Sequence, residues 1–471
     1  MLGVTPKGKQ EEVMALPAEG HIIVLGTAGS GKTTIALLRA VHLANLPGNA
    51  KVLLVTFNRA LVQYMRGISN SSPRNLTFEN YHKFARGYLN SRGKMPSTNG
   101  ILQPEQKIYY IEQAVAAMKK QFPTESTFRR SKEFFTDEIT FIQRFGFADL
   151  AAYYEAERIG RAAANIKREN RKWIFAAYEK YKELRAEAGR PYDWDDLALH
   201  VYTELQSDKT ERRYTHVIVD EGQDFSPMMI RSLVSAVGSN GSFTFFGDVA
   251  QQIYGSRLSW RDSGVNADKL WHFDINYRNP ATITAFTSDL TESEYWQKND
   301  DLVIATNQIA EGPKPILVQF EDKIREINWV IQRAIAAGET SSTVIVCRNR
   351  ADINSFMKGL QKKGCNATVI DKETPGYAHV TTVYLTTFHA AKGLEFDNVF
   401  VPFLSDDKLP DPDAVTAAVS EADAYSDEIK LLYVAATRSK YGLYMTYHGT
   451  LTPLFPRNSD NYDAYGEEDL Q

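Results

Sequence analysis

Short apolar runs alternate with amphipathic segments over the first 60 residues of the chain. Residues 22–25 and 52–57 are apolar and rich in β-branched side chains and are bounded by turn residues, which predicts two strands. Between them, the apolar positions of residues 34–40 recur with helical spacing. Strands that alternate with helices predict a parallel sheet covered by helices, so the pattern favours an α/β fold.

The pattern changes between about residues 88 and 190, where long helical segments such as 107–121 and 165–188 replace the strand-like runs. We expect a helical insertion here. Residues 161–190 carry nine Lys or Arg and four Glu, a local net charge of +5. Such a segment can bind a phosphate backbone and stack bases, or it can be a solvated helix whose aromatic residues pack in a core. The second interpretation is favoured on this segment alone. The aromatic residues are Trp173, Phe175, Tyr178 and Tyr181.

Strands and helices return after residue 190. Residues 217–219 and 243–246 are expected to be buried central strands, each followed by acidic chemistry. After Pro280, five more short apolar runs predict a second α/β domain. They lie at residues 315–320, 343–347, 383–386, 399–402 and 443–447. The acidic segment 405–428 is expected to be an exposed loop or insertion, and the acidic, polar residues 458–471 are expected to form a flexible tail.

Composition narrows the class of protein. A chain of 471 residues is too long for one compact core, so two to four domains are expected. Contents of 43% hydrophobic and 24% charged residues are typical of globular proteins. A net charge of −4 means that any nucleic-acid surface must be local. No apolar run approaches the roughly 20 residues that span a bilayer, so no membrane partner is expected. Two cysteines, Cys347 and Cys365, fit a reducing, cytoplasmic location.

A glycine-rich loop lies between the first predicted strand and the first predicted helix. Its glycines allow successive backbone N–H groups to face inward as an anion-binding nest, and the helix that follows adds its positive end. In this context Lys32 would contact the β- and γ-phosphates of a nucleoside triphosphate, and the Thr33 hydroxyl would bind Mg²⁺. The residues expected to surround the nucleotide here are Gly26, Thr27, Ala28, Gly29, Ser30, Gly31, Lys32, Thr33 and Thr34.

Two acidic residues follow the predicted strand 217–219. Ligands bind at the carboxyl ends of parallel strands, where Asp220 could hold Mg²⁺ directly or through water. Glu221 is placed to orient and deprotonate an attacking water. A phosphate loop and a strand that ends in two acids together predict hydrolysis of a nucleoside triphosphate.

The acidic run Asp220-Glu221-Gly222-Gln223-Asp224 resembles the second helicase motif of the UvrD/Rep family, the superfamily-one DNA translocases. Segments 9–13, 55–60, 77–84, 192–197 and 246–254 resemble other family motifs, in the family's order. The resemblance implies that Gln10 reads adenine and that Gln251 senses the γ-phosphate. It implies contact with a DNA strand for Thr56, Phe57, Asn58, Arg59, His82, Tyr254 and Arg257. Where many relatives have a base-stacking Trp in the third motif, this chain has Tyr254-Gly255-Ser256-Arg257, which leaves that stacking step in question.

The second half of the chain is similar to the family's remaining motifs at segments 276–278, 386–396 and 432–438. The resemblance implies that Arg278 and Arg438 are arginine fingers and that Tyr277 stacks on adenine. It places Gly393 and Glu395 near the nucleotide and Thr387 and His389 near DNA.

The resemblance also implies a fold and a function. It predicts two RecA-like domains, parallel sheets flanked by helices: the first in residues 1–87 and 191–279, interrupted by the insertion 88–190, and the second in 280–457, followed by the tail 458–471. Only about 40 residues lie between Cys347 and Thr387, so the comparison with the family implies that its second helical insertion is absent or vestigial in this chain. The function implied is an ATP- and Mg²⁺-dependent translocase or helicase on single-stranded DNA, moving 3′ to 5′ from a 3′-tailed duplex. The alternative is a nucleic-acid-sensing ATPase that regulates a partner nuclease; RNA is a less expected substrate.

Overall fold

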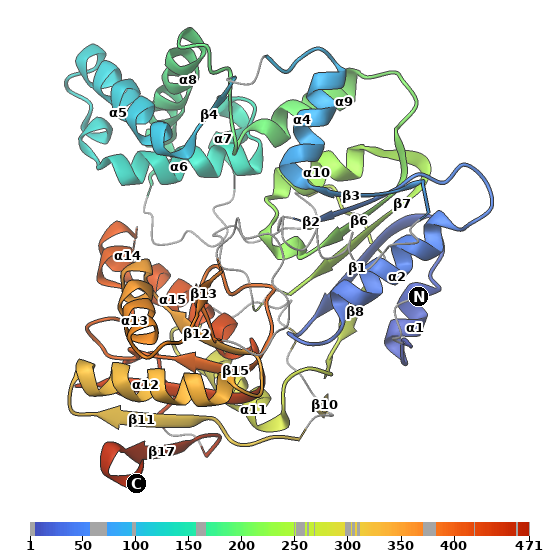
Figure 1. Ribbon diagram of the computed structural model, residues 1–471. Helices are drawn as coiled ribbons and strands as arrows, with labels where there is room; N and C mark the ends of the chain where they lie inside the picture. The colour runs from blue at the N-terminus through green and yellow to red at the C-terminus, as the bar shows by residue number, and fades with distance from the viewer. Residues whose placement is uncertain are drawn as a thin grey trace.

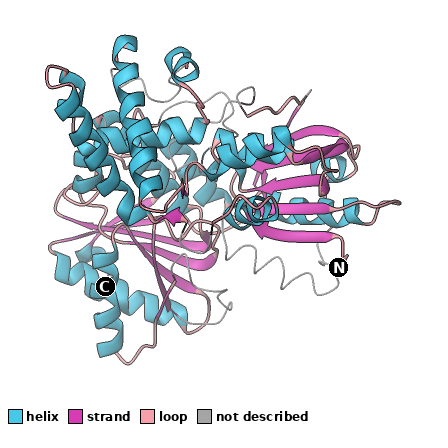
Figure 2. Ribbon diagram, turned by 90° about the horizontal axis from the view of Figure 1, so that it is seen from above, coloured by secondary structure: helices cyan, strands magenta, loops and turns pink. Residues whose placement is uncertain are grey.

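The structure is a computed structural model, and two lobes with a helical insertion make up the part of it that is described (Figure 1). The described residues are 5–56, 73–96, 100–156, 166–248, 250, 260, 263–267, 269–296, 303, 307–308, 311–370, 383–418, 420–457 and 460–470. Figure 2 shows the two sheets as separate groups of strands, each with helices packed against it. None of the described helices is both long and apolar enough to cross a membrane.

The first lobe is built on a six-stranded parallel sheet in the order β3-β2-β6-β7-β1-β8. Alternate side chains of β1, β2 and β6 enter two different cores, one on each face of the sheet. On one face Val24, Leu54 and Ile218 pack with helix α2; on the other, Leu25 and Val55 pack with helices α4, α9 and α10. The elements are α1 (Lys9–Met14), β1 (Gly20–Gly26), α2 (Lys32–Ala44), β2 (Val52–Thr56), β3 (Leu76–Asn80), α4 (Tyr81–Ser91), α9 (Leu197–Ser207), β6 (Tyr214–Asp220), α10 (Pro227–Ser235), β7 (Val237–Gly247) and β8 (Leu270–Phe273).

The helical insertion leaves and rejoins the first lobe through a two-stranded parallel pair, β4 (Ile101–Leu102) with β5 (Tyr192–Asp193). Its main helices are α5 (Pro104–Gln121), α6 (Lys132–Phe145), α7 (Leu150–Glu155) and α8 (Arg171–Glu187). They enclose a separate core in which Phe175, Tyr178 and Tyr181 are buried and Trp173 is partly buried. The prediction that these aromatic residues pack in a core is therefore confirmed.

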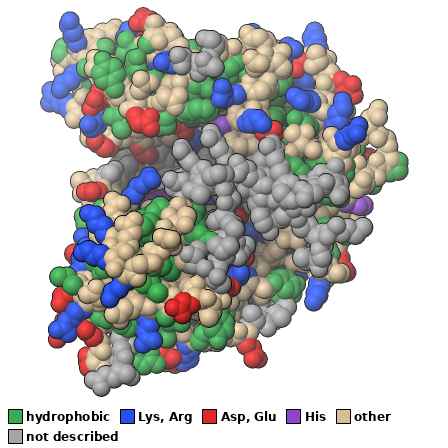
Figure 3. All heavy atoms as spheres, in the orientation of Figure 1, with side chains coloured by type: hydrophobic (Ala, Val, Ile, Leu, Met, Phe, Trp, Pro, Cys, Tyr) green, Lys and Arg blue, Asp and Glu red, His purple; other side chains and the backbone are tan. Residues whose placement is uncertain are grey.

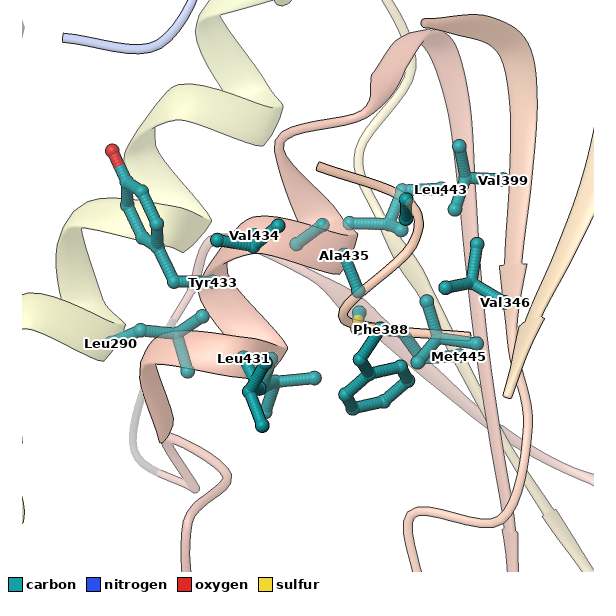
Figure 4. Close-up of a cluster of buried hydrophobic side chains, with 14 of the residues drawn as sticks. Leu290, Val346, Phe388, Val399, Leu431, Tyr433, Val434, Ala435, Leu443 and Met445 are labelled. Atoms are coloured by element: carbon teal, nitrogen blue, oxygen red, sulfur yellow. The ribbon is translucent and has the colours of Figure 1, made fainter. Parts of the chain in front are cut away.

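The second lobe is built on a seven-stranded parallel sheet in the order β13-β14-β12-β15-β16-β11-β17. Figure 4 shows part of its main core, where Leu431 and Val434 of α15 lie with Val346, Val399 and Met445 of the sheet. The two-residue strand β9 (Ile275–Asn276) pairs with β10 (Asn307–Gln308). The remaining elements are α11 (Ala281–Glu292), β11 (Ile316–Phe320), α12 (Lys323–Gly338), β12 (Thr343–Cys347), α13 (Arg350–Lys362), β13 (Thr368–Val369), β14 (Val383–Thr387), β15 (Phe396–Val401), α14 (Pro412–Ala417), α15 (Glu421–Ala436), β16 (Ser439–His448) and β17 (Asp463–Gly466).

Two expectations about acidic segments were wrong. Residues 460–470 are ordered: β17 pairs with β11 at the edge of the second sheet, and a short 3₁₀ helix, Glu467–Leu470, follows it. Main-chain pairing needs no apolar side chains, so the acidic composition did not prevent it. The segment 405–428 is not an exposed loop, because it folds into α14 and the start of α15, and Glu428 of α15 is 2% exposed and forms an ion pair with Arg348.

Candidate nucleotide site between the two lobes

The glycine-rich loop connects β1 to α2 and closes tightly on itself. Gly29 and Gly31 have φ values of +74° and +82°, a region that residues with a Cβ rarely adopt. The side chain of Lys32 is 8% exposed, and its ammonium donates to the carbonyls of Gly26 (2.8 Å) and Thr27 (2.6 Å). It also lies 3.4 Å from the Asp248 carboxylate. These contacts hold the lysine within the loop, where incoming phosphate oxygens would compete for it.

Helix α1 brings Gln10 to the back of this loop. The Gln10 amide donates to the Ser30 carbonyl over 2.9 Å, and its oxygen accepts from the main-chain N–H of Lys7. A Cβ at Gly31 would lie 2.9 Å from the Gln10 amide nitrogen, so the approach requires glycine at that position. The loop and the residue expected to read adenine are therefore in direct contact.

Asp220 lies at the carboxyl end of β6, beside Thr56 at the end of β2. Its side chain is 1% exposed, and neither carboxylate oxygen has a hydrogen-bond partner of ordinary geometry. Burial and the neighbouring Glu221 raise the pKa of Asp220 to about 7, against the opposing influence of the Thr33 hydroxyl and the Lys32 charge.

A buried carboxylate whose oxygens have no hydrogen-bond partner of ordinary geometry, next to a threonine hydroxyl, fits a Mg²⁺ site. Mg²⁺ prefers oxygen ligands and keeps several waters, so one carboxylate, one hydroxyl and the phosphates of the substrate suffice. Among the described residues, no group of three or more His, Cys, Asp or Glu side chains forms a metal site by itself. Thr33 and Asp220 are thus the residues that would hold Mg²⁺, which would neutralise charge on the phosphate oxygens.

Glu221 has the backbone conformation φ +54°, ψ +40°, which is unusual for a residue with a Cβ. Gln223 fixes its side chain: the amide of Gln223 donates to Glu221 over 2.6 Å, and its oxygen accepts from the main-chain N–H of Asp248 over 2.8 Å. Burial alone would raise the pKa of Glu221, but the positive charges of Lys392, Lys32 and Arg438 outweigh it and lower that pKa. Glu221 is therefore an ionised carboxylate in the interior.

Cationic side chains near the second sheet reach this acidic site. Lys392, after β14, forms an ion pair with Asp224, with side chains 8% and 7% exposed. Arg438, after α15, is 2% exposed, and burial and the Arg278 charge lower its pKa to about 10, against the opposing charges of Glu221, Glu395 and Asp248. Both cations therefore lie close to the residues of the first lobe that would surround a γ-phosphate.

Arg278 lies on the segment that joins the lobes and pairs with Glu395. The main-chain N–H of its neighbour Tyr277 donates to the Gly29 carbonyl over 3.0 Å. A Cβ at Gly29 would lie 2.2 Å from the Asn276 amide oxygen and 2.6 Å from the Arg278 Cβ. The joining segment thus packs directly on the phosphate loop, with Tyr277 half-buried beside it.

The remaining residues that the sequence predicts near the nucleotide or DNA lie in the phosphate loop, on α2 and in the segment at and after the end of β14. Gly393 has a φ of +80°, and Ala28 is buried in the loop, whereas Thr34 is only partly buried on α2. Thr387 ends β14 and its hydroxyl accepts from the N–H of Ala390 over 3.2 Å; His389 follows it, half-buried.

Of the residues expected to contact DNA in the first lobe, Thr56 is fully buried. His82, near the start of α4, packs edge-on against Trp194 with ring centroids 5.1 Å apart. Figure 3 shows a hollow in the molecular face between the helical insertion and the second lobe. Phe57, Asn58, Arg59, Gln251, Tyr254 and Arg257 lie outside the described residues.

Sequence reasoning missed four residues of this arrangement as site residues. Gln223 and Asp224 lie within the acidic motif and Lys392 within a recognised motif, but their roles depend on partners 25 to 168 residues away. Asp248 directly follows β7, and its side chain is 2% exposed beside Lys32. Burial raises the pKa of Asp248, against the opposing Lys32 charge. The sequence signal that could have identified Asp248 as a site residue is its position directly after a buried strand.

Comparison with known proteins agrees with this geometry. The model described as UvrD/REP helicase N-terminal domain matches residues 7–267, and the UvrD-like helicase C-terminal domain matches 271–375 and 373–450. The chain is 24% identical over 464 residues to "Probable DNA helicase" of Mycoplasma pneumoniae, covering 93% of this chain and 82% of that protein. It is 24% identical to "DNA helicase II" of Haemophilus influenzae over 67% of this chain, and it spans 45% of that relative.

A third relative, "Putative ATP-dependent DNA helicase YjcD" of Bacillus subtilis, is 25% identical over 62% of this chain and is matched over 37% of its own length. Among solved structures, the C-terminal domain of a possible DNA helicase from Lactobacillus plantarum WCFS1 covers 40% of this chain and 98% of its own, with 23% identity and a TM-score of 0.29. The N-terminal model alone spans more than half of the sequence. The chain belongs to the UvrD/REP helicase family.

Proposed function

We propose that this chain hydrolyses ATP at the seam between its two lobes and uses the cycle to move along single-stranded DNA in the 3′ to 5′ direction. One observation supports the proposal most strongly. Lys392 and Arg438, after elements of the second lobe, act on Asp224 and Glu221 of the first. A triphosphate bound by Lys32 would therefore be enclosed by cations from both lobes.

The chemistry follows from the positions of these side chains. Glu221 stays ionised and is oriented by Gln223, so it can accept a proton from a water molecule. Lys32, Arg278 and Arg438 would stabilise the charge that spreads over the transferred phosphoryl group. Because these cations would bind the γ-phosphate in the closed arrangement, ATP favours closure and its hydrolysis releases the second lobe. If both lobes hold one DNA strand, closure and release become movement.

Direction is tested by strand displacement on short duplexes that carry either a 3′ or a 5′ single-stranded tail, with the Lys32→Ala variant as the inactive control. The proposal expects displacement from the 3′ tail only, and none by the variant. Displacement from the 5′ tail alone would reject the polarity. The same substrates built with an RNA tail separate a DNA motor from an RNA motor, since the proposal expects DNA to be preferred.

The alternative function is a nucleic-acid-sensing ATPase that regulates a partner nuclease, and the acidic segments 405–428 and 458–471 are candidate docking sites for such a partner. The structure weakens the case for docking at these segments. Glu428 forms an ion pair with Arg348 inside the second lobe, and β17 is an edge strand that pairs with β11. Displacement activity of the purified chain alone would favour the motor. A chain that hydrolyses ATP with DNA but separates no duplex unless a nuclease partner is added would favour the regulator.

A further inference from the structure

Arg39, on the second turn of α2 after Lys32, is fully buried and makes an unusual set of contacts. Its guanidinium donates to the carbonyls of Val13 (3.0 Å), Met14 (3.2 Å), Leu16 (3.1 Å) and Pro17 (3.0 Å), and to the Thr244 hydroxyl (3.1 Å). In the part of the chain that is described, no carboxylate forms an ion pair with it. A buried cation is thus devoted mainly to main-chain oxygens.

Four of the five acceptors belong to the end of α1 and the residues that follow it. The last carbonyls of a helix have no partners within the helix, and a cation there also complements the helix dipole. Helix α1 has only six residues, too few to be stable without tertiary contacts. Besides the buried Val13, Arg39 is therefore a principal attachment of α1 to α2.

Helix α1 carries Gln10, and α2 begins at Lys32. Gln10 lies one helical turn before Val13 and Met14, whose carbonyls Arg39 holds. Its amide touches the phosphate loop at Ser30. A shift of α1 along α2 would therefore displace Gln10 from the loop without touching any phosphate-binding group.

We propose that Arg39 is a positioning residue for base recognition: by capping the end of α1 it fixes Gln10 at the distance from the phosphate loop at which Gln10 selects adenine. This inference rests on the proposed function, because it assumes that ATP is the substrate. Arginine suits the role better than lysine, since its planar fork donates in several directions at once, whereas lysine presents a single ammonium. Among the described residues, the hydrogen bonds of the Arg39 guanidinium go to Val13, Met14, Leu16, Pro17 and Thr244, and to no residue of the phosphate loop.

The test compares kcat and KM for ATP and GTP in the unmodified full chain and in three variants of it, with single-stranded DNA present. Arg39→Lys should raise KM for ATP about tenfold, equal to about 1.4 kcal/mol, with kcat nearly unchanged. KM for GTP should change little, so the preference for ATP falls by the same factor. Gln10→Ala should lose the preference as well, and the double variant should lose no more than Gln10→Ala alone, since both changes remove one function.

Two further variants keep the result interpretable. Arg92→Lys makes the same substitution at a half-exposed ion pair with Glu204 and should leave the preference unchanged. Thr244→Val removes a single acceptor from Arg39 and should lower the preference in the same direction, even where Arg39→Lys fails to fold. If Arg39→Lys and Thr244→Val keep the ATP preference while Gln10→Ala loses it, the inference about Arg39 is wrong, but the proposed function is not affected. An unchanged preference in Gln10→Ala would overturn the inference and the role of Gln10, and absence of ATP hydrolysis would overturn the proposed function.

Discussion

Replacing Lys392 by methionine should slow ATP hydrolysis by roughly a hundredfold while leaving nucleotide binding to the first lobe nearly unchanged. The side chains of Lys392 and Asp224 are 8% and 7% exposed, so the substitution leaves a buried carboxylate without this cation. Breaking a buried pair costs about 3–5 kcal/mol. In the proposed cycle both groups would become hydrated when the lobes part, so the cost would fall on closure. About 3 kcal/mol corresponds to roughly a hundredfold fewer closed molecules.

The assay is steady-state ATP hydrolysis with saturating single-stranded DNA, alongside nucleotide affinity measured by a fluorescent ATP analogue. Lys440→Met is the matched control, because Lys440 pairs with Asp397 across a partly exposed surface (3.3 Å), where such pairs contribute less than about 1 kcal/mol. The positive charge of Lys392 also helps to lower the pKa of Glu221, so its removal should shift the acid limb of the rate profile to higher pH. Wild-type kcat with an unshifted profile in Lys392→Met would refute the reasoning.

Three further outcomes are expected from the same geometry. Glu221→Gln should lower kcat by a factor of about 10²–10⁴ with nucleotide binding retained, and near-normal turnover would exclude Glu221 as the base. Gly29→Ala should abolish nucleotide binding, because φ is +74° at this position and the new Cβ would lie 2.2 Å from Asn276. Calorimetry measures the binding, and an unchanged affinity in this variant would contradict the prediction.

Burial raises the pKa of Asp220 to about 7 from an ordinary 3.8, so the metal-free fold loses stability as pH rises from about 4 to 7, and protons compete with Mg²⁺ below pH 7. The rise in melting temperature on adding Mg²⁺ should therefore be larger at pH 8 than at pH 6. Equal rises would show that Asp220 does not hold the metal.

The central parts of the fold could be predicted because local patterns determine them. The run 22–25, the glycine loop and the periodic residues 34–40 predict strand, loop and helix, which the structure has as β1, the loop and α2. The five short runs after Pro280 correspond to β11, β12, β14, β15 and β16. Each is nearly continuous in apolar residues because both faces of a parallel sheet are covered.

Other parts depend on partners that the sequence does not reveal. In the sequence, Glu428 is one of several acidic residues in an acidic segment. In the structure it is buried and forms an ion pair with Arg348, which lies 80 residues earlier in the chain. Strand β17 holds its place by main-chain pairing with β11, which leaves little trace in side-chain composition. Gln223 and Asp224 belong to the acidic motif that the sequence shows. Their contacts with Asp248 and Lys392 arise only when the strands and lobes come together.

The most direct measurement of the central claim is ATP hydrolysis by the unmodified chain with Mg²⁺, in the absence and presence of single-stranded DNA, beside Arg438→Lys. The account predicts that DNA strongly stimulates hydrolysis in the unmodified chain, because a bound strand favours the closed seam, and that Arg438→Lys loses this stimulation while it still binds ATP. Hydrolysis at the same rate with and without DNA, or full stimulation in Arg438→Lys, would contradict it.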